Sequence, residues 1–141
     1  MQGSSRAILL LLLASATTGC LDTTLDESYP TMAAAVADGA VARGWVPEWL
    51  PANATDLDEV HDLDSNESAL SFSVPAGTKL ALPAKCSLVQ AGDRLPTRFD
   101  RGWWPAEVEL ERSYTFYSCP TGFVGLHKSG RRAVHWRASA R

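Results

Sequence analysis

Three oxygen-bearing side chains recur at alternate positions in the middle of the chain: Asp62, Asp64 and Asn66. Oxygens at this spacing open a calcium-binding loop, because alternate side chains of a tight turn converge on one hard cation. The sixth and twelfth positions of such a loop are Gly and Glu, whereas this chain has Glu67 and Ser73 there. We therefore expect the three residues to cap turns in an irregular connection, and we expect no metal site.

The histidines His61, His127 and His135 are the side chains best suited to acid–base chemistry near neutral pH. None stands in a zinc-binding H-E-x-x-H pattern, no serine has the G-x-S-x-G context of an activated nucleophile, and no glycine-rich phosphate loop is present. The sequence therefore predicts no catalytic residue and no cofactor. A pocket that encloses His61 with Asp56 or Asp62 would instead favour an enzyme.

The candidate ligand-facing aromatics are tryptophans, which come in two pairs: Trp45 with Trp49, and Trp103 with Trp104. The first pair lies beside Pro47 and Pro51, which forbid a regular helix and favour extended backbone. Such a segment is typical of an apolar strap packed across a core, and an exposed platform for a sugar is the alternative. A surface cluster of all four rings would favour ligand binding.

The first twenty residues have the pattern of an export signal. Arg6 precedes ten residues, from Ala7 to Ala16, of which only Ser15 is polar. This apolar run is too short for a membrane span, which needs about 20 residues. Gly19 and Cys20 then resemble the lipobox of bacterial lipoproteins, so we expect residues 1–19 to be removed and Cys20 to carry lipid chains such as palmitate.

A second way of processing this signal is also open. Thr17 stands where a lipobox usually has Leu, and residues 14–16 (A-S-A) offer an ordinary cleavage site that would leave a soluble chain with a free Cys20. In a host with two membranes, Leu21 after the cysteine resembles the pattern for sorting to the outer membrane. The sequence therefore predicts a cell-envelope protein, lipid-anchored and, in such a host, on the outer membrane facing the periplasm.

Export also bears on the other two cysteines. If Cys20 is lipidated, Cys86 and Cys119 remain in an oxidising compartment, where thiols are rarely left unpaired. Cys119 ends an aromatic run that is typical of a strand, and Cys86 opens an apolar run. We predict a disulfide between them, with two separately buried thiols as the alternative.

Charge is distributed unevenly along the chain, although the formal net charge is only −3. Residues 44–67 contain seven acids and no Lys or Arg, whereas residues 127–141 contain five bases and no acid. This is typical of two solvated faces, with contact between the basic end and anionic lipid or cell-wall polymer as the alternative. The expected partners are a membrane, through the anchor, and an envelope protein or cell-wall polymer, but not nucleic acid.

The rest of the chain predicts one small domain. Residues 20–28 are polar and are expected to form a tether, and residues 29–141 suffice for a single core. Thr31 before M-A-A-A-V-A predicts a short capped helix over 32–37. The alternating run A-L-S-F-S-V predicts a half-buried strand over 69–74, and residues 90–106 are expected to be mostly loop.

From Val108 the chain is strand-like, and it predicts an antiparallel meander over 113–119, 123–128 and 132–137. The fold class that follows is α+β, with a short N-terminal helical segment packed on a mainly antiparallel β-sheet.

The pattern also predicts how the last two strands pair. A three-residue loop would place Leu126 opposite Val134 and Val124 opposite Trp136, which gathers four apolar residues on one face. The same register would put His127 on the face that carries His135.

Residues 44–67 read G-W-x-P-x-x-L-P-x-x-A-T-D-x-x-E-x-H-D-L-D-x-N-E. In this stretch, in W-W-P at 103–105 and in A-V-H-W at 133–136, the chain resembles a group of uncharacterised bacterial exported lipoproteins. The resemblance implies an exported single domain and no particular activity. The sequence thus predicts a lipid-anchored envelope protein that is a non-enzymatic binding or structural module, with a small envelope hydrolase as the alternative.

Overall fold

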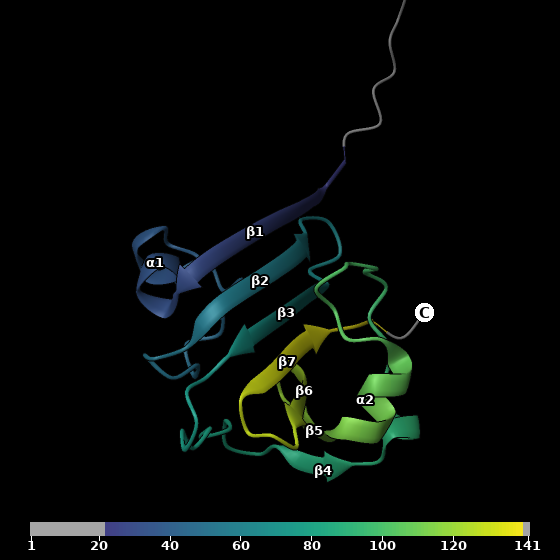
Figure 1. Ribbon diagram of the computed structural model, residues 1–141. Coiled ribbons are helices and arrows are strands. Elements are labelled where there is room, and N and C mark those ends of the chain that lie inside the picture. Colours follow the sequence, from purple (N-terminus) through teal and green to yellow (C-terminus); the bar gives the residue numbers. More distant parts are fainter. Residues whose placement is uncertain (1–21, 140–141) are drawn as a thin grey trace, which may run out of the picture.

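The computed structural model describes residues 22–139, so the expected signal at 1–19 and Cys20 lie outside the described residues (Figure 1). Within 22–139 the backbone forms one seven-stranded antiparallel sheet, two short α-helices and one short 3-10 helix. In chain order these are Thr24–Thr31 (β1), Met32–Ala37 (α1), Thr55–Asp62 (β2), Ser68–Ser73 (β3), Ser87–Val89 (β4), Ala91–Asp93 (η1), Glu107–Ser113 (α2), Tyr114–Cys119 (β5), Gly122–His127 (β6) and Arg132–Arg137 (β7). The predicted antiparallel sheet is confirmed, whereas the α+β class fits only loosely because the sheet dominates. Neither α-helix of this region is long and apolar enough to cross a membrane.

The strand order is β1-β2-β3-β7-β6-β5-β4, so the sheet consists of two halves joined where β3 pairs with β7. At this junction Ser68 lies opposite Arg137 and Leu70 lies opposite His135. The last strand of the chain therefore sits in the middle of the sheet, next to a strand that precedes it by about sixty residues.

Both faces of the sheet are covered. On one face, α1 and the connection to β2 pack their apolar side chains onto β2, β3 and β7, in a core that includes Met32, Val46, Leu57, Leu70 and Phe72. On the other face, α2 and the loop before it pack onto the same strands, in a core that includes Val60, Phe99, Leu110, Val134 and Trp136. We call these the strap face and the α2 face. The central strands consequently bury alternate residues on opposite sides.

The first helix forms as its sequence predicts. The Thr31 hydroxyl accepts the backbone N–H of Ala34 at 3.1 Å, which caps the helix N-terminus. Met32 and Ala35 are buried and fix the helix on the strap face. Gly39 follows with φ of 82°, a backbone angle that glycine adopts without strain, and the helix ends before it.

Three segments differ from the sequence-based expectation. Residues 24–28, which were expected to belong to a tether, form the first part of β1, and the acidic stretch expected to be irregular contains β2. Residues 107–113 form α2 rather than the start of a strand. The V-E-L-E alternation there resembles a strand. Glu107 and Glu109 lie in the first turn of a helix, however, where the helix dipole favours negative charge, and Leu110 alone is buried.

The predicted register of the last two strands is wrong by one residue. Leu126 lies opposite Ala133 and Val124 lies opposite His135. The prediction assumed that one face is apolar and the other solvated, but both faces of β7 are buried, so apolar residues do not mark a single side. His127 and His135 therefore lie on opposite faces of the sheet.

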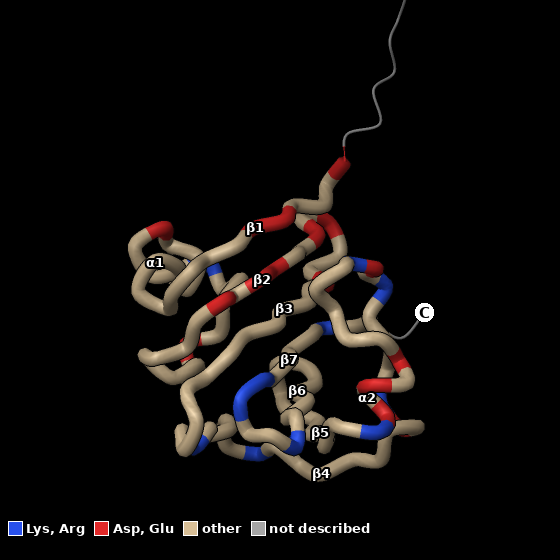
Figure 2. Tube along the Cα trace, in the orientation of Figure 1, with Lys and Arg blue, Asp and Glu red and all other residues tan. Residues whose placement is uncertain are grey.

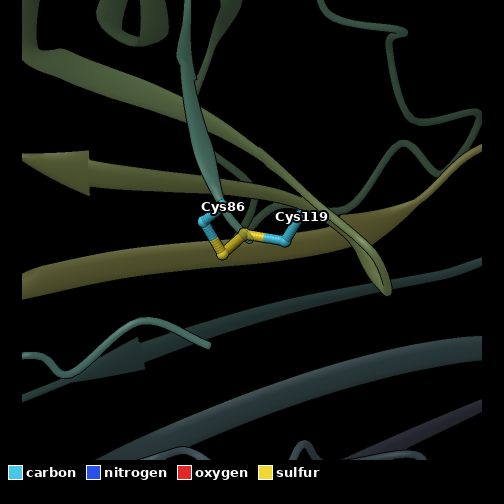
Figure 3. The surroundings of a disulfide bond; sticks show 2 residues. All are labelled: Cys86 and Cys119. Carbon is cyan, nitrogen blue, oxygen red and sulfur yellow. A yellow bond between two sulfur atoms is a disulfide. The ribbon is translucent and has the colours of Figure 1, made fainter. Parts of the chain in front are cut away.

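The predicted disulfide between Cys86 and Cys119 is present (Figure 3). Cys86 directly precedes β4, and Cys119 is the last residue of β5. The two strands pair antiparallel, with Ser87 opposite Ser118. The bond therefore ties the three-residue edge strand β4 to the sheet beside it.

Charge follows the topology of the sheet, as Figure 2 shows. Acidic residues lie along β1 and β2 and in the turn after β2, at the end of the sheet where Thr24 opposes Asp62. Basic residues lie in the turn between β6 and β7, at the end where the backbone N–H of Val74 donates to the carbonyl of Arg131. Basic residues thus gather at one end of the fold, but the acidic end also carries arginines, since Arg98 pairs with Asp62 and Arg101 with Asp26.

Candidate functional site

A buried acid–base pair lies on the strap face of β2. Glu59 and His61 are two residues apart in the strand, so their side chains leave the same face. Nδ1 of His61 lies 3.0 Å from each carboxyl oxygen of Glu59. The side chains are 0% (Glu59) and 5% (His61) exposed, so the surrounding solvent does little to stabilise a charge on either.

Burial shifts the two pKa values in opposite directions. It raises the pKa of Glu59 to about 8, with a further contribution from the negative charge of Glu27. It lowers the pKa of His61, although Glu27 opposes that shift. At neutral pH the pair is therefore uncharged overall, with one proton on the line between Nδ1 and the carboxyl group. When the carboxyl group donates to Nδ1, or when the proton has moved onto the imidazole, Nε2 of His61 carries a hydrogen and is a donor.

Trp45 covers the imidazole. Its ring stacks on His61 with 3.9 Å between ring centroids, and the Arg43 guanidinium lies 4.0 Å from the centroid of the Trp45 ring. Arg43 is held in turn by Asp38 at 2.7 Å. Gly44, just before the tryptophan, has φ of 78°, which glycine tolerates best. The expected apolar strap is thus folded over the buried pair.

A recess of about 140 Å³ opens beside this pair; its lining residues are Gly44, Trp45, His61, Asp62, Leu63, Asn66, Ser68 and Arg137. Two nitrogen atoms of the lining residues are buried and have no hydrogen-bond partner: Nε2 of His61 and Nε of Arg137. The rest of the Arg137 guanidinium is held by Nη2 donating to the Gly44 carbonyl at 3.1 Å and Nη1 to Asn66 Oδ1 at 3.4 Å. The recess is therefore lined by hydrogen-bond donors that are fixed in place.

Asp62 lines the same recess, but its carboxylate is occupied elsewhere. It accepts the backbone N–H groups of Asp64 at 2.9 Å and Ser65 at 2.7 Å, and it pairs with Arg98 at 2.6 Å. These bonds, the Ser65 backbone N–H first among them, hold the pKa of Asp62 well below its usual range. Asp62 thus caps the turn after β2. Glu59, not Asp62 or Asp56, is the carboxyl group that bonds His61.

The four tryptophans lie on two faces and do not form one cluster. Trp49 lines a groove of about 430 Å³ on the strap face, together with Val46 and Pro83, and its ring meets His135 edge-on at 5.9 Å. Trp103 and Trp104 belong to the α2 face, where Trp104 packs edge-on against Trp136 at 5.6 Å. Of the four, Trp45 is the one that contacts the buried pair.

The histidines are also separated. His127 lies at the end of β6, where its ring bonds the Ser129 hydroxyl at 2.8 Å. His135 is 2% exposed on the strap face of β7, and its Nε2 has no partner. Among residues 22–139, no group of three or more His, Cys, Asp or Glu side chains is arranged to hold a metal ion.

The burial of His135 predicts an acid-sensitive fold. Burial lowers the pKa of His135 to about 4 from an ordinary 6.5, so the unfolded chain binds the proton more readily. Its contribution to stability is complete above pH 6.5 and is lost as the pH falls through 4. We expect wild type to lose about 3 kcal/mol more than His135→Gln between pH 7 and 4 in urea unfolding. Equal losses in both proteins would contradict this.

Two residues of the site were not singled out by sequence analysis, Glu59 and Arg137. The signal for Glu59 is the E-x-H spacing, which places both side chains on one face once the segment is recognised as a strand. Arg137 carries no local signal, since it reaches the recess because β7 pairs with β3.

The protein is thus of a class with one antiparallel sheet covered on both faces. A buried Glu–His pair lies on one face, under a segment that carries Trp45. Residues 23–73 match the family model of the YbbD head domain, a bacterial family. The match spans β1, α1, β2 and β3, and so it includes Glu59 and His61 but not Arg137. No curated protein and no solved structure matches the chain.

Proposed function

We propose that this protein is a lipid-anchored component of the bacterial cell envelope that binds an envelope ligand, a wall polymer or a protein, and is not an enzyme. The signal pattern at 1–20 and the bacterial family match at 23–73 support the compartment. The motif that resembles exported lipoproteins, residues 44–67, lies inside the matched region and contains Trp45, Glu59 and His61.

One observation carries the binding function. The recess presents two buried N–H donors without partners, from His61 and Arg137, and buried donors are almost always satisfied in folded proteins. A bound acceptor would satisfy both. Catalysis by His61 as a general base would instead need a free lone pair on Nε2, which the tautomer with a hydrogen on Nε2 lacks.

The alternative is a small hydrolase, and one observation favours it. Ser68 lies opposite His61 across the β2–β3 pair, and both residues line the recess. With Glu59 behind the histidine, the three residue types are those of a nucleophile, a base and its orienting carboxylate. A fluorophosphonate probe distinguishes the two readings: we expect no adduct on Ser68, and an adduct that is lost in His61→Ala would establish the hydrolase.

The anchor has its own test. We expect protein extracted from membranes to begin at Cys20 and to carry acyl chains, seen by intact mass, and we expect Cys20→Ala to be released from membranes. The short apolar run and Gly19–Cys20 are the basis for this expectation. A mature N-terminus at Thr17 with no added mass would show instead that cleavage follows residues 14–16.

Wall binding is tested by co-sedimentation with purified peptidoglycan sacculi. We expect wild type to sediment with sacculi, Arg137→Gln to stay in solution, and Arg132→Gln to behave as wild type. Both arginines belong to β7, but only Arg137 lines the recess, whereas Arg132 lies at the basic end of the fold. Loss of binding in Arg132→Gln alone would place the contact at the basic end and contradict a role for the recess.

A further inference from the structure

We propose that the recess beside His61 is a binding site for a carboxylate group, held by Nε2 of His61 and Nε of Arg137. This inference deepens the proposed binding function, on which it rests, by naming the chemistry of the group that is bound. It concerns the recess alone and makes no claim about the groove under Trp49.

The donors come from two strands that the fold brings together. His61 extends from β2 and Arg137 from β7, and Ser68 of β3 lies between them, opposite both residues in the sheet. Each donor atom is buried and has no protein acceptor. Glu59 holds the imidazole, and Gly44 and Asn66 hold the guanidinium, so both groups are already oriented. Because the two nitrogens are buried, an acceptor reaches them only after a neighbouring side chain moves aside.

The charge balance favours an anion. None of the ion pairs formed within residues 22–139 involves Arg137, so its positive charge has no carboxylate at contact distance. Arg137 lines the recess and two neighbouring cavities. Asp62 is the acid that lines the recess, and Arg98 and two backbone N–H groups occupy its oxygens. An incoming carboxylate would therefore meet an uncompensated guanidinium.

The size and walls of the recess favour a small carboxylate. A volume of 140 Å³ is nearly five times the ~30 Å³ that a water molecule takes in the liquid, which is room for a group of about four or five non-hydrogen atoms. Two donors suit the two oxygens of a carboxylate, and Trp45 and Leu63 supply apolar wall for the carbon attached to it. Such a group is found in free small acids and at the C-terminus of a peptide, including a wall peptide.

The test is a titration followed by nuclear magnetic resonance of ¹⁵N-labelled protein. Sodium acetate at constant ionic strength should shift the His61 ring and Trp45 indole resonances saturably, with a dissociation constant on the order of 1 mM for so small a ligand. Methylammonium chloride, a cation of similar size, should not. N-acetylalanine is the second arm: binding of both probes indicates a chain terminus, and binding of acetate alone indicates a free small acid.

Two variants and a matched control complete the experiment. Arg137→Gln removes the charge and should weaken acetate binding tenfold or more, and His61→Leu removes the other donor and should do the same. Arg132→Gln, on the same strand but outside the recess, should bind as wild type. An unchanged Trp136 indole resonance in each variant shows that the fold is intact.

The pH dependence of acetate binding is a further readout. The charged groups that act on the Glu59–His61 pair are Glu27 and Asp26 of β1, Asp62 at the end of β2, Arg43 of the strap and Arg137 of β7. When the Glu59–His61 pair loses its shared proton, Nε2 becomes an acceptor and the pair becomes negative. Acetate binding should therefore weaken as the pH rises through about 8.

No saturable shift below about 50 mM acetate, or equal shifts in wild type and Arg137→Gln, would show that the recess holds water only and would overturn the inference. Failure of this inference can be distinguished from failure of the proposed binding function. If acetate does not bind but sacculi still retain wild type, the protein is a wall-binding module whose ligand enters elsewhere.

Discussion

Glu59→Gln should make the protein more stable than wild type above pH 8, although the variant alters a fully buried residue. The carboxyl group of Glu59 has its pKa raised to about 8 from an ordinary 4.5, so the folded state holds a proton that the unfolded chain releases. The contribution of this group is complete below pH 4.5 and is lost as the pH rises through 8. The shift corresponds to an upper limit of about 5 kcal/mol, and glutamine avoids this loss.

The measurement is urea unfolding of both proteins at pH 4.5, 6.5 and 8.5. We expect nearly equal free energies of unfolding at pH 4.5, because the amide of glutamine can replace a protonated carboxyl as the partner of His61 Nδ1. The difference should grow in favour of the variant at each higher pH. Titrating groups away from the pair cancel in this difference, whereas His61 does not, because it shares a proton with Glu59. Glu111→Gln, on the exposed side of α2, is the matched control and should follow wild type.

Glu59→Ala should behave in the opposite way from Glu59→Gln. It leaves Nδ1 of His61 buried without a partner and opens a cavity, so we expect a loss of about 3–5 kcal/mol at neutral pH. If Glu59→Gln and wild type change in parallel with pH, folding does not raise the pKa of Glu59, and the proton-sharing pair that underlies the binding site is wrong.

The second large effect is expected from the disulfide. Cys86→Ser and Cys119→Ser should each lower the free energy of unfolding by about 3–4 kcal/mol, since the bond closes a loop whose ends are 33 residues apart. Between β4 and β5 that loop contains η1, α2 and the Gly- and Pro-containing segment 94–106, which forms no helix or strand. The effect is a large part of the ~5–15 kcal/mol of a typical domain.

The double variant identifies the cause of that loss. Cys86→Ser with Cys119→Ser should be little less stable than either single variant, because the same bond is absent in all three. Additive losses would mean that each thiol contributes through its own packing. Nonreducing peptide mapping gives the direct check, and alkylation of both thiols in unreduced, denatured protein would contradict the bond.

The parts of the fold that depend on nearby residues could be predicted from the sequence. The helix at 32–37 follows from its Thr31 cap and the glycine after it, and the disulfide follows from cysteine count and compartment. The β6–β7 register could not be predicted from the sequence. His135 and Trp136 are buried on opposite faces, and their residue types do not show which face each one occupies. Two-sided burial removes the alternation on which register prediction depends.

The candidate site shows the same division. His61 and Trp45 stand out by residue type, but their partners do not. In the sequence, Glu59 looks like one of several solvated acids. Its pKa is raised only because the strap buries it, and the sequence does not show this burial. Arg137 is 76 positions from His61, and it reaches the recess through strand pairing, which the local sequence does not encode.

Because β3 pairs with β7, the sheet cannot be completed until the last strand has been synthesised. The segment β1–β3 emerges first and can form its own meander, but the outer edge of β3 has its hydrogen-bonding groups unpaired until β7, the final strand, has been made. A nascent or truncated chain that ends before Arg132 therefore leaves the edge of β3 unpaired, and in the complete fold this edge lies in the middle of the sheet. Quality-control proteases would meet an open edge flanked by two apolar faces, so premature termination near the C-terminus should be as damaging as loss of half the protein.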